Sequence, residues 1–323
     1  MLDLSGHQGS VIGMKNKPLM ALNIMIITLA LILSTTGCGK TAPAFEAESQ
    51  VAQDYGGATV SFLGPEGTYT QEACGVFFNK QGSYKPYETV SDAVDALESG
   101  ASDYAVIPQE NTIGGAVTDY IDIVIAHDSL SVVGEVELSI NQNLLALPGA
   151  KLEDIKTVFS HKQGIAQGKE WIEKNIPDAE VIEVSSTAEG AKMVSESGDK
   201  TVAAIASAAC ADVYHLELLA SAIQENSNNK TRFYVLSKEA PATAESQRLA
   251  FIASDSAKDL APLMKDMDNL KMTLVTVHDR PLKTELGEYS YIIECADCSY
   301  EDYRKLKEKS TLDLRFLGCF SLY

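Results

Sequence analysis

The stretch YAVIPQENTIGGAVTDYIDIVI, residues 104–125, changes from strand to polar loop to helix within one short segment. Its first residues form an apolar run that ends at Pro108, as is typical of a buried strand. A polar loop with adjacent glycines follows. Apolar side chains then recur at the spacing of one helix face, on Val117, Tyr120, Ile121, Val124 and Ile125. The succession of strand, loop and helix predicts one unit of an α/β fold.

The same succession occurs in two sets along the chain, the first from Val60 and the second from Thr157. Strands that alternate with helices predict mostly parallel sheets, and two sets predict two lobes with a cleft between them. Ser186 and Ser207 are expected to cap two of the helices. The predicted strands are 60–63, 104–108, 130–138, 142–147, 157–160, 179–184, 201–206 and 232–237, and the other predicted helices include 71–79 and 163–175.

The C-terminal part of the chain has a different order of elements. Residues 240–247, APATAESQ, have the composition of a linker. Beyond them the apolar pattern predicts a βαββαβ order, which is that of the ferredoxin-like fold. We therefore expect a two-lobed α/β domain over 58–239 and a small ferredoxin-like domain over 248–323, a reasonable size for a separate domain.

The N-terminal residues 18–39 contain no charged side chain and follow a segment with two lysines. A basic segment before an apolar one indicates a secretion signal. Small residues lead into Cys38, as in a bacterial lipoprotein signal, whose cysteine becomes lipidated. An uncleaved membrane anchor is the alternative, because the run is just long enough to span a bilayer. We expect a signal or anchor over 1–40 and a polar tether over 41–57, hence an extracytoplasmic lipoprotein, or a cytoplasmic protein if the segment is not a working signal.

The composition narrows the class of function. The formal net charge of −19 makes nucleic acid an unexpected partner, although local donors still allow a small anionic substrate. The Gly-rich loop GPEGT, residues 64–68, lacks the Gly-Lys-Ser/Thr ending of a phosphate loop, and the polar loops show no Ser-His-Asp order. Its histidines are scattered, so no metal site is predicted. Cys295 and Cys298 form a lone CxxC, which is interpreted as a strand end with two incidental thiols, and the irregular cysteine spacing predicts no disulfide framework.

Three polar loops follow strands, at the edge where open α/β sheets bind ligands. The first, 110–112, lies beside a helix N-terminus, whose free N–H groups favour anions. The second is 160–163 and the third is 230–233. The three loops are rich in neutral hydrogen-bond donors. Taken alone, each is equally well interpreted as a cap, a turn or a solvated face, and composition gives no reason for them to converge.

Local geometry adds detail to two of these loops. Ser160 is expected to cap the helix that follows it. Gln163 and Gln167 lie one turn apart on that helix and share a face. Strand alternation would place Thr231 and Arg232 on opposite faces of their strand.

A resemblance to a known family supplies the reason for convergence. In chain order, the segments FLGPEGTYTQEA (62–73), VIPQENTIGGAV (106–117), SHKQGIAQGKEWI (160–172) and NNKTRFYVL (228–236) resemble prephenate dehydratase. The C-terminal segments around VHDRP and RFLGCF resemble its ACT regulatory domain. The resemblance implies a two-lobed catalytic domain like that of periplasmic binding proteins, followed by ACT. It also implies conversion of prephenate to phenylpyruvate without a cofactor, on the route to phenylalanine.

The resemblance further implies roles for individual residues. Thr231 is the implied catalytic residue, which would hydrogen-bond the leaving hydroxyl of the dianionic substrate. Phenylalanine is the implied effector, and ACT pairing implies a homodimer or a higher homo-oligomer. Lys162 stands where the family commonly has proline, and 258–260 reads Lys-Asp-Leu where the family has Gly-Ala-Leu. The implied substrate-binding residues are Glu110, Asn111, Thr112, Ser160, Gln163, Gln167, Arg232 and Phe233, and the implied regulatory residues are Leu260, His278, Asp279, Arg280 and Pro281.

Three alternatives stay open from the residues. Arogenate dehydratase differs only in an amino group that replaces the keto oxygen of the substrate. A solute-binding lipoprotein would share the two lobes and the lipid tether, but it would lack the three loop motifs and the ACT segment. A catalytically silent ACT sensor is the third alternative.

Overall fold

The computed structural model describes residues 54–239, 247–254 and 260–323. The predicted signal, the lipidation site at Cys38 and almost all of the predicted linker lie outside these residues. Within the described ranges no helix combines the length and the apolarity needed to cross a bilayer. Tyr55 packs edge-on against Phe78, so residues 55–57, predicted as the end of the tether, belong to the folded part.

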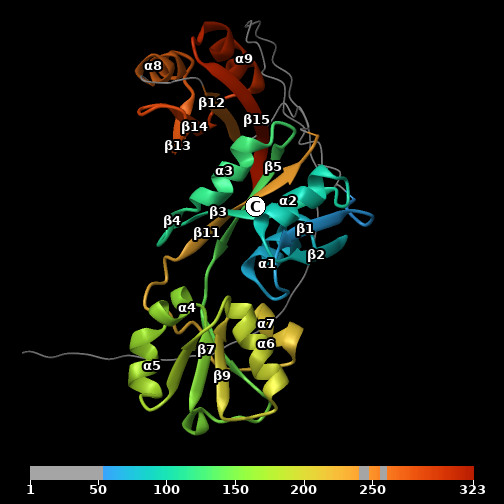
Figure 1. Ribbon diagram of the computed structural model, residues 1–323, viewed down its shortest axis with the longest axis vertical. Helices are drawn as coiled ribbons and strands as arrows, with labels where there is room; N and C mark the ends of the chain where they lie inside the picture. The colour runs from blue at the N-terminus through green and yellow to red at the C-terminus, as the bar shows by residue number, and fades with distance from the viewer. Residues whose placement is uncertain (1–53, 240–246, 255–259) are drawn as a thin grey trace, which may run out of the picture. The chain divides into compact units, whose positions relative to one another are not determined.

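The first lobe is built on a sheet in which the strands of one half run parallel to one another (Figure 1). Strand β1 (Thr59–Leu63) lies between β2 (Ser83–Tyr87) and β3 (Tyr104–Asn111), and both neighbours run parallel to it. Helices α1 (Tyr69–Phe77) and α2 (Val90–Glu98) make the crossovers that parallel strands require.

The other half of this sheet is antiparallel. Strand β11 (Lys230–Ser237) lies between β3 and β5 (Ser131–Ser139) and runs against both. Short strand β4 (Gly115–Ala116) pairs with the end of β3 and leads into α3 (Thr118–Ala126). The buried residues of α3 lie on its predicted apolar face.

The prediction that the strand ends at Pro108 is wrong, because β3 continues to Asn111. The register with β11 shifts beyond Pro108: Phe233 pairs with Pro108 and Arg232 with Glu110, which leaves Gln109 without an opposite residue. A proline has no N–H to give to a ladder, and such an irregularity is where a strand tolerates one.

The second lobe contains a separate sheet in the order β10-β6-β9-β7-β8. Its strands β7, β8 and β9 are parallel, whereas β6 and β10 are antiparallel. The prediction of mostly parallel sheets is therefore wrong in detail. Both sheets are mixed, since the chain crosses between the lobes through residues 140–142 and returns through 221–229. The strands are β6 (Asn143–Ala146), β7 (Thr157–Ser160), β8 (Glu180–Glu183), β9 (Val202–Ala206) and β10 (Glu217–Ala220).

Four α-helices and a 3-10 turn, η1 (Leu152–Asp154), belong to this lobe in the described chain. The helix predicted over 163–175 is two helices that meet at Gly168, where a Cβ would lie 3.3 Å or less from two isoleucine side chains. The Ser186 cap is confirmed, because its side chain accepts from the N–H of Glu189. The Ser207 cap is wrong: this hydroxyl donates to the carbonyl of Gly67 instead. The helices are α4 (Lys162–Gln167), α5 (Lys169–Asn175), α6 (Thr187–Ser197) and α7 (Ala209–Tyr214).

The C-terminal part has the predicted βαββαβ order, with its strands in the spatial order β13-β14-β12-β15. This arrangement is ferredoxin-like. The end of β15 also pairs with β5, Leu322 opposite Glu135, so the ferredoxin-like sheet continues into the first lobe (Figure 1). Its elements are β12 (Arg248–Ser254), α8 (Ala261–Asn269), β13 (Thr273–Pro281), β14 (Tyr289–Ala296), α9 (Tyr300–Lys309) and β15 (Asp313–Leu322).

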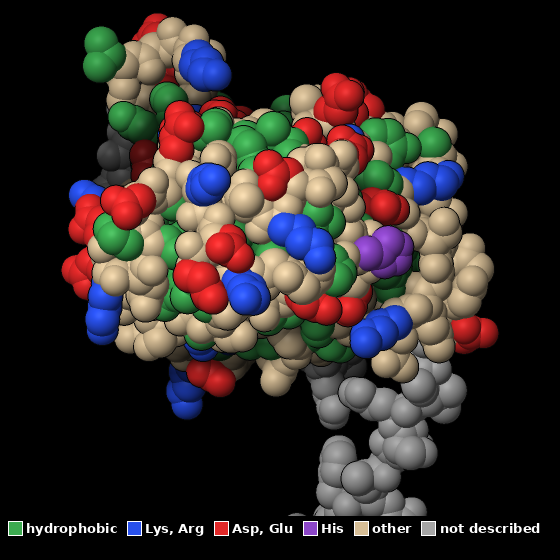
Figure 2. All heavy atoms as spheres, turned by 90° about the horizontal axis from the view of Figure 1, so that it is seen from below, with side chains coloured by type: hydrophobic (Ala, Val, Ile, Leu, Met, Phe, Trp, Pro, Cys, Tyr) green, Lys and Arg blue, Asp and Glu red, His purple; other side chains and the backbone are tan. Residues whose placement is uncertain are grey.

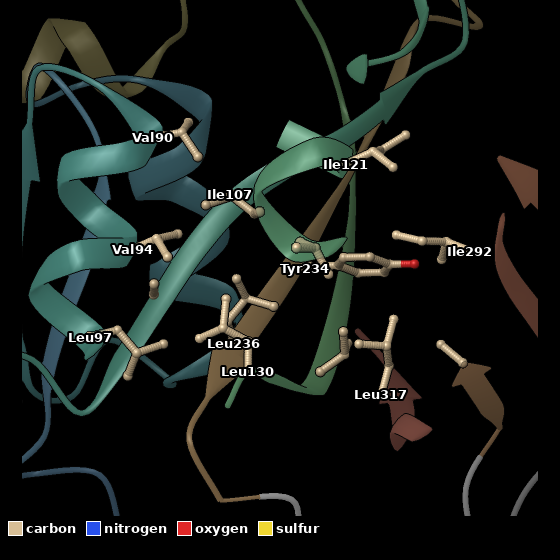
Figure 3. Packing of buried hydrophobic residues seen from close by; sticks show 14 of the residues in the cluster. Val90, Val94, Leu97, Ile107, Ile121, Leu130, Tyr234, Leu236, Ile292 and Leu317 are labelled. Carbon is tan, nitrogen blue, oxygen red and sulfur yellow. The ribbon is translucent and has the colours of Figure 1, made fainter. Parts of the chain in front are cut away.

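One hydrophobic core joins the first lobe to the ferredoxin-like domain. Ile107 and Tyr234 of the first sheet pack with Ile292 of β14 and Leu317 of β15, and all are essentially inaccessible to solvent. Figure 3 shows the ring of Tyr234 between the helical and the ferredoxin-like sides of this core. Shared burial of this kind holds the domain in place by the hydrophobic effect.

Candidate active site

The ends of β3 and β11 bring the first and third loops together. Thr231 lies opposite Asn111 in the strand register, and the Nδ2 of Asn111 donates to the Oγ1 of Thr231 at 2.9 Å. The Oδ1 of Asn111 accepts the N–H groups of Ile113 and Gly114, each at 2.9 Å. Both ends of this amide are therefore held, and its donor is directed at the Thr231 hydroxyl.

Thr112 fastens the two loops to each other. Its hydroxyl donates to the carbonyl of Asn228 at 2.9 Å and accepts the N–H of Lys230 at 3.0 Å. Its own N–H donates to the carbonyl of Lys230 at 2.9 Å. Because this side chain uses its hydroxyl on the backbone, its role in the structure is to set the loop geometry.

The second loop reaches the first two through two buried amides. The Nδ2 of Asn229, which is 1% exposed, donates to the Oε1 of Gln167 at 3.0 Å, while its Oδ1 accepts from Asn111 at 2.8 Å. The Nε2 of Gln142 donates to the same Gln167 oxygen at 3.0 Å. Gln163 lies nearby, since a Cβ on Gly114 would be 3.5 Å from its Nε2. The three loops thus converge, as the resemblance implied.

Asn229 and Gln142 are site residues that sequence reasoning missed. Both lie on the segments that cross between the lobes, where no periodic pattern singles them out. The Oε1 of Gln142 is buried without a protein hydrogen-bond partner and lies close to Gly164. A buried amide oxygen without a partner is costly, so this acceptor is suited to a ligand or a bound water.

Arg232 does not offer a free cation. Its Nη1 donates to Glu110 at 3.0 Å, its Nε donates to Glu135 at 2.8 Å, and its Nη2 donates to both Glu135 and Glu294. Burial alone would lower the pKa of Arg232, but the carboxylates, Glu135 foremost, raise it overall. The interpretation of Arg232 as a ligand for a substrate carboxylate is therefore not supported by its contacts.

A family model described as prephenate dehydratase matches residues 60–241. The chain belongs to the prephenate dehydratase family. A bifunctional chorismate mutase/prephenate dehydratase of Neisseria gonorrhoeae is 37% identical over 238 residues, or 73% of this chain and 66% of that protein. The prephenate dehydratase of Lactococcus lactis subsp. cremoris is 31% identical over 280 residues, or 82% of this chain and 98% of that protein.

A solved structure shows the same fold. A prephenate dehydratase from Arthrobacter aurescens, in complex with L-Phe, has a TM-score of 0.71 and 27% sequence identity, and the match covers 81% of this chain and 89% of that chain. These relatives confirm the predicted membership of the prephenate dehydratase family, the α/β fold class and the lyase class.

Ser160 of this chain does not have the capping role that the sequence predicted. Its hydroxyl is fully buried and donates to the carbonyl of Ile205 at 2.7 Å, so it does not cap α4. His161 is the cap instead, and burial together with Lys162 lowers the pKa of its imidazole. Gly164 keeps this corner open, because a Cβ there would lie 2.5 Å from the Ser160 oxygen.

Phe233 lies in the core rather than at the site surface. It is 2% exposed and packs with Val60, Phe62 and Val136 beneath the sheet. The structure therefore gives Phe233 a packing role, holding β11 in place, where the resemblance implied contact with substrate.

Two of the implied regulatory residues, His278 and Arg280, lie close to charged residues of the first lobe. Arg280 forms a two-point ion pair with Asp122 of α3, with bonds of 2.6 and 2.9 Å. Burial lowers the pKa of His278, and the nearby charges of Glu110 and Arg232 act on it in opposite directions. Asp279 and Pro281 occupy the end of β13, and Leu260 immediately precedes α8.

No group of side chains suited to a metal ion is found among residues 54–239, 247–254 and 260–323. Figure 2 shows Asp and Glu interspersed with Lys and Arg on one face of the molecule.

Proposed function

We propose that this protein is a prephenate dehydratase in which Thr231 assists departure of the ring hydroxyl. Prephenate carries a ring carboxylate, a pyruvyl carboxylate and a ring hydroxyl. When the bond to the ring carboxylate breaks, carbon dioxide leaves, the electron pair completes the aromatic ring, and hydroxide departs and takes up a proton to become water. The product is phenylpyruvate. Aromatisation supplies the drive, so the protein has to hold the dianion and stabilise the departing hydroxide.

The observation that carries this proposal is the bond from Asn111 Nδ2 to Thr231 Oγ1, 2.9 Å long. A hydroxyl that accepts from an amide N–H keeps its own O–H free to donate. That O–H would then hydrogen-bond the oxygen on which negative charge develops, where donors contribute most to rate. Threonine is too weak an acid to give up its proton freely, so its role is to orient and stabilise.

The surrounding amides support substrate binding. Gln163 and Gln167 present neutral donors, and the unpartnered Oε1 of Gln142 offers an acceptor. Glu110 shares its carboxylate with Arg232 and lies one residue before Asn111. Its ion pair with Arg232 supports the end of β3 beside Asn111.

The test is turnover of prephenate to phenylpyruvate by the purified full chain, measured beside Thr231→Val and Thr231→Ser. Loss of one donor to developing charge costs about 100-fold to 1000-fold in kcat, so Thr231→Val should lose that much and Thr231→Ser should keep most of the activity. Thr273→Val, an exposed threonine on β13, is the matched control. Equal activity of Thr231→Val and the control would contradict the role of Thr231.

The same assay separates the alternatives. Turnover of arogenate but not of prephenate would identify an arogenate dehydratase. Tight binding of prephenate without turnover by the wild type would identify a solute-binding protein or a silent sensor.

Regulation, assembly and location are further parts of the proposal. L-Phe bound to the relative from Arthrobacter aurescens supports phenylalanine as an effector here, acting through Leu260 and 278–281. Inhibition of turnover by phenylalanine would test it. The homodimer is tested by light scattering. Membrane anchoring through Cys38 is tested by incorporation of radiolabelled palmitate, which Cys38→Ala should abolish.

A further inference from the structure

A carboxylate of the ferredoxin-like domain reaches the catalytic strand of the first lobe. Glu294, on β14, is 0% exposed, and one of its oxygens accepts from the guanidinium of Arg232. Its other oxygen accepts from the hydroxyl of Tyr234 and, at 3.4 Å, from the Nε2 of Gln109. Glu294 thus holds side chains from β3 and β11 at once, and two of these, Gln109 and Arg232, lie within two residues of Asn111 and Thr231.

The two strands are irregular at the level of these contacts. Arg232 pairs with Glu110 and Phe233 pairs with Pro108, so Gln109 is the extra residue of a β-bulge. Bulges bend a strand and redirect the side chains that follow, and they are frequent beside active sites. Here the side chains that follow are Glu110 and Asn111, both part of the proposed site.

Glu294 bonds to both sides of this bulge, Gln109 on the bulged strand and Arg232 opposite. Removing a carboxylate from water costs free energy unless its partners compensate. Burial accordingly raises the pKa of Glu294, while Arg232 and Tyr234 oppose the shift. Arg232 already has Glu110 and Glu135 as counter-charges, so its charge is neutralised without Glu294. Glu294 therefore serves to hold Gln109 and Arg232 in place from the ferredoxin-like domain.

We propose that Glu294 is a positioning residue of the dehydratase site, which fixes the bulge at Gln109 and Arg232 and so directs Asn111 toward Thr231. This inference rests on the proposed function, since it assigns Glu294 an effect through the Thr231 hydroxyl. It makes the ferredoxin-like domain a structural part of the catalytic site in the same chain.

The test compares Glu294→Gln with the wild type in prephenate turnover by the full chain. Glutamine keeps the shape but removes the charge. A small misplacement of catalytic groups can cost about 100-fold, so kcat should fall by about 10-fold to 100-fold while KM changes by less than about threefold. Glu301→Gln, an exposed glutamate of α9 in the same domain, is the matched control and should leave both constants near the wild-type values.

A second readout separates positioning from loss of folding. In an Asn111→Ala background the Glu294→Gln substitution should have little further effect on kcat, because residues that act through one another are not additive. Multiplicative losses in the double variant would overturn the proposal, and so would a kcat for Glu294→Gln equal to that of the wild type. If Glu294→Gln does not fold, Tyr234→Phe, which removes one donor to Glu294, is measured and judged by the same criteria.

The outcome for the wild type keeps the two proposals apart. A wild type that turns prephenate over, beside an equally active Glu294→Gln, defeats only the role of Glu294. A wild type without turnover overturns the proposed function and this inference with it.

Discussion

Replacing Asn229 by alanine should destabilise the protein and weaken the site at the same time. This side chain joins Asn111 to Gln167 through bonds of 2.8 and 3.0 Å and is 1% exposed. It is the direct link between the end of β3 and helix α4. Alanine removes both bonds without introducing a new charge.

The magnitude follows from what the partners keep. Asn111 Nδ2 still bonds Thr231 at 2.9 Å, and Gln167 Oε1 still accepts from Gln142 at 3.0 Å. Neither partner is left unsatisfied, so each lost bond counts at its net value of about 1 kcal/mol, and the sum is about 2 kcal/mol. For a folded unit of this size that corresponds to a fall in Tm of roughly 4–8 °C.

The assay is thermal unfolding of the full chain beside Asn226→Ala. Asn226 lies in the same segment but is exposed and bonds only the N–H of Asn228 among the hydrogen bonds of the described chain. Its replacement should change stability by less than about 0.5 kcal/mol. The kcat/KM for prephenate should fall about tenfold or more in Asn229→Ala, because Asn111 loses one of its fixed partners. If Asn229→Ala melts no lower than Asn226→Ala, the reasoning about a link between the lobes is refuted.

Three further outcomes are expected. Gly67→Ala should lower the free energy of unfolding by about 2 kcal/mol, because Gly67 has a φ of +83° and a Cβ there would lie 2.9 Å from a cysteine sulfur. Gly57→Ala, whose Cβ would meet no atom within 4 Å, should change it by almost nothing. Equal melting temperatures of the two variants would contradict this. Asp122→Asn should lose at most about 1 kcal/mol at pH 7. The bond from Arg280 lowers the pKa of Asp122, so the stabilisation is present above the unfolded carboxyl pKa of about 3.9 and declines as pH falls through the lower folded value. A melting difference between the two proteins that does not shrink as the pH falls below about 4 would refute it. Iodoacetamide should alkylate Cys298 before the buried thiols. A hydrogen bond from Cys295 lowers the pKa of the Cys298 thiol, and Cys298 is partly exposed. Peptide mass spectrometry that finds a buried thiol labelled first would refute this.

The ferredoxin-like order and the alternation of strands and helices could be predicted from the sequence, because both depend on local apolar periodicity. The strand from Tyr104 and the helix face of Ile121 and Val124 follow from that periodicity. The convergence of the loops at 110–112, 160–163 and 230–233 could be predicted only from the resemblance to the family, because no local pattern relates residues so far apart in the chain.

The tertiary structure alone decided how individual polar side chains are used. Arg232 is the clearest case: its sequence neighbours predict a cation at the site, but the carboxylates that neutralise it come from β3, β5 and β14. Ser160 is at a helix start and would be a cap by propensity, yet a carbonyl on β9 takes its hydroxyl. Local sequence determines which residues are available at a strand end. Which partner each of them meets depends on strands that are distant in the chain, and a buried polar group bonds whatever the packed fold places beside it.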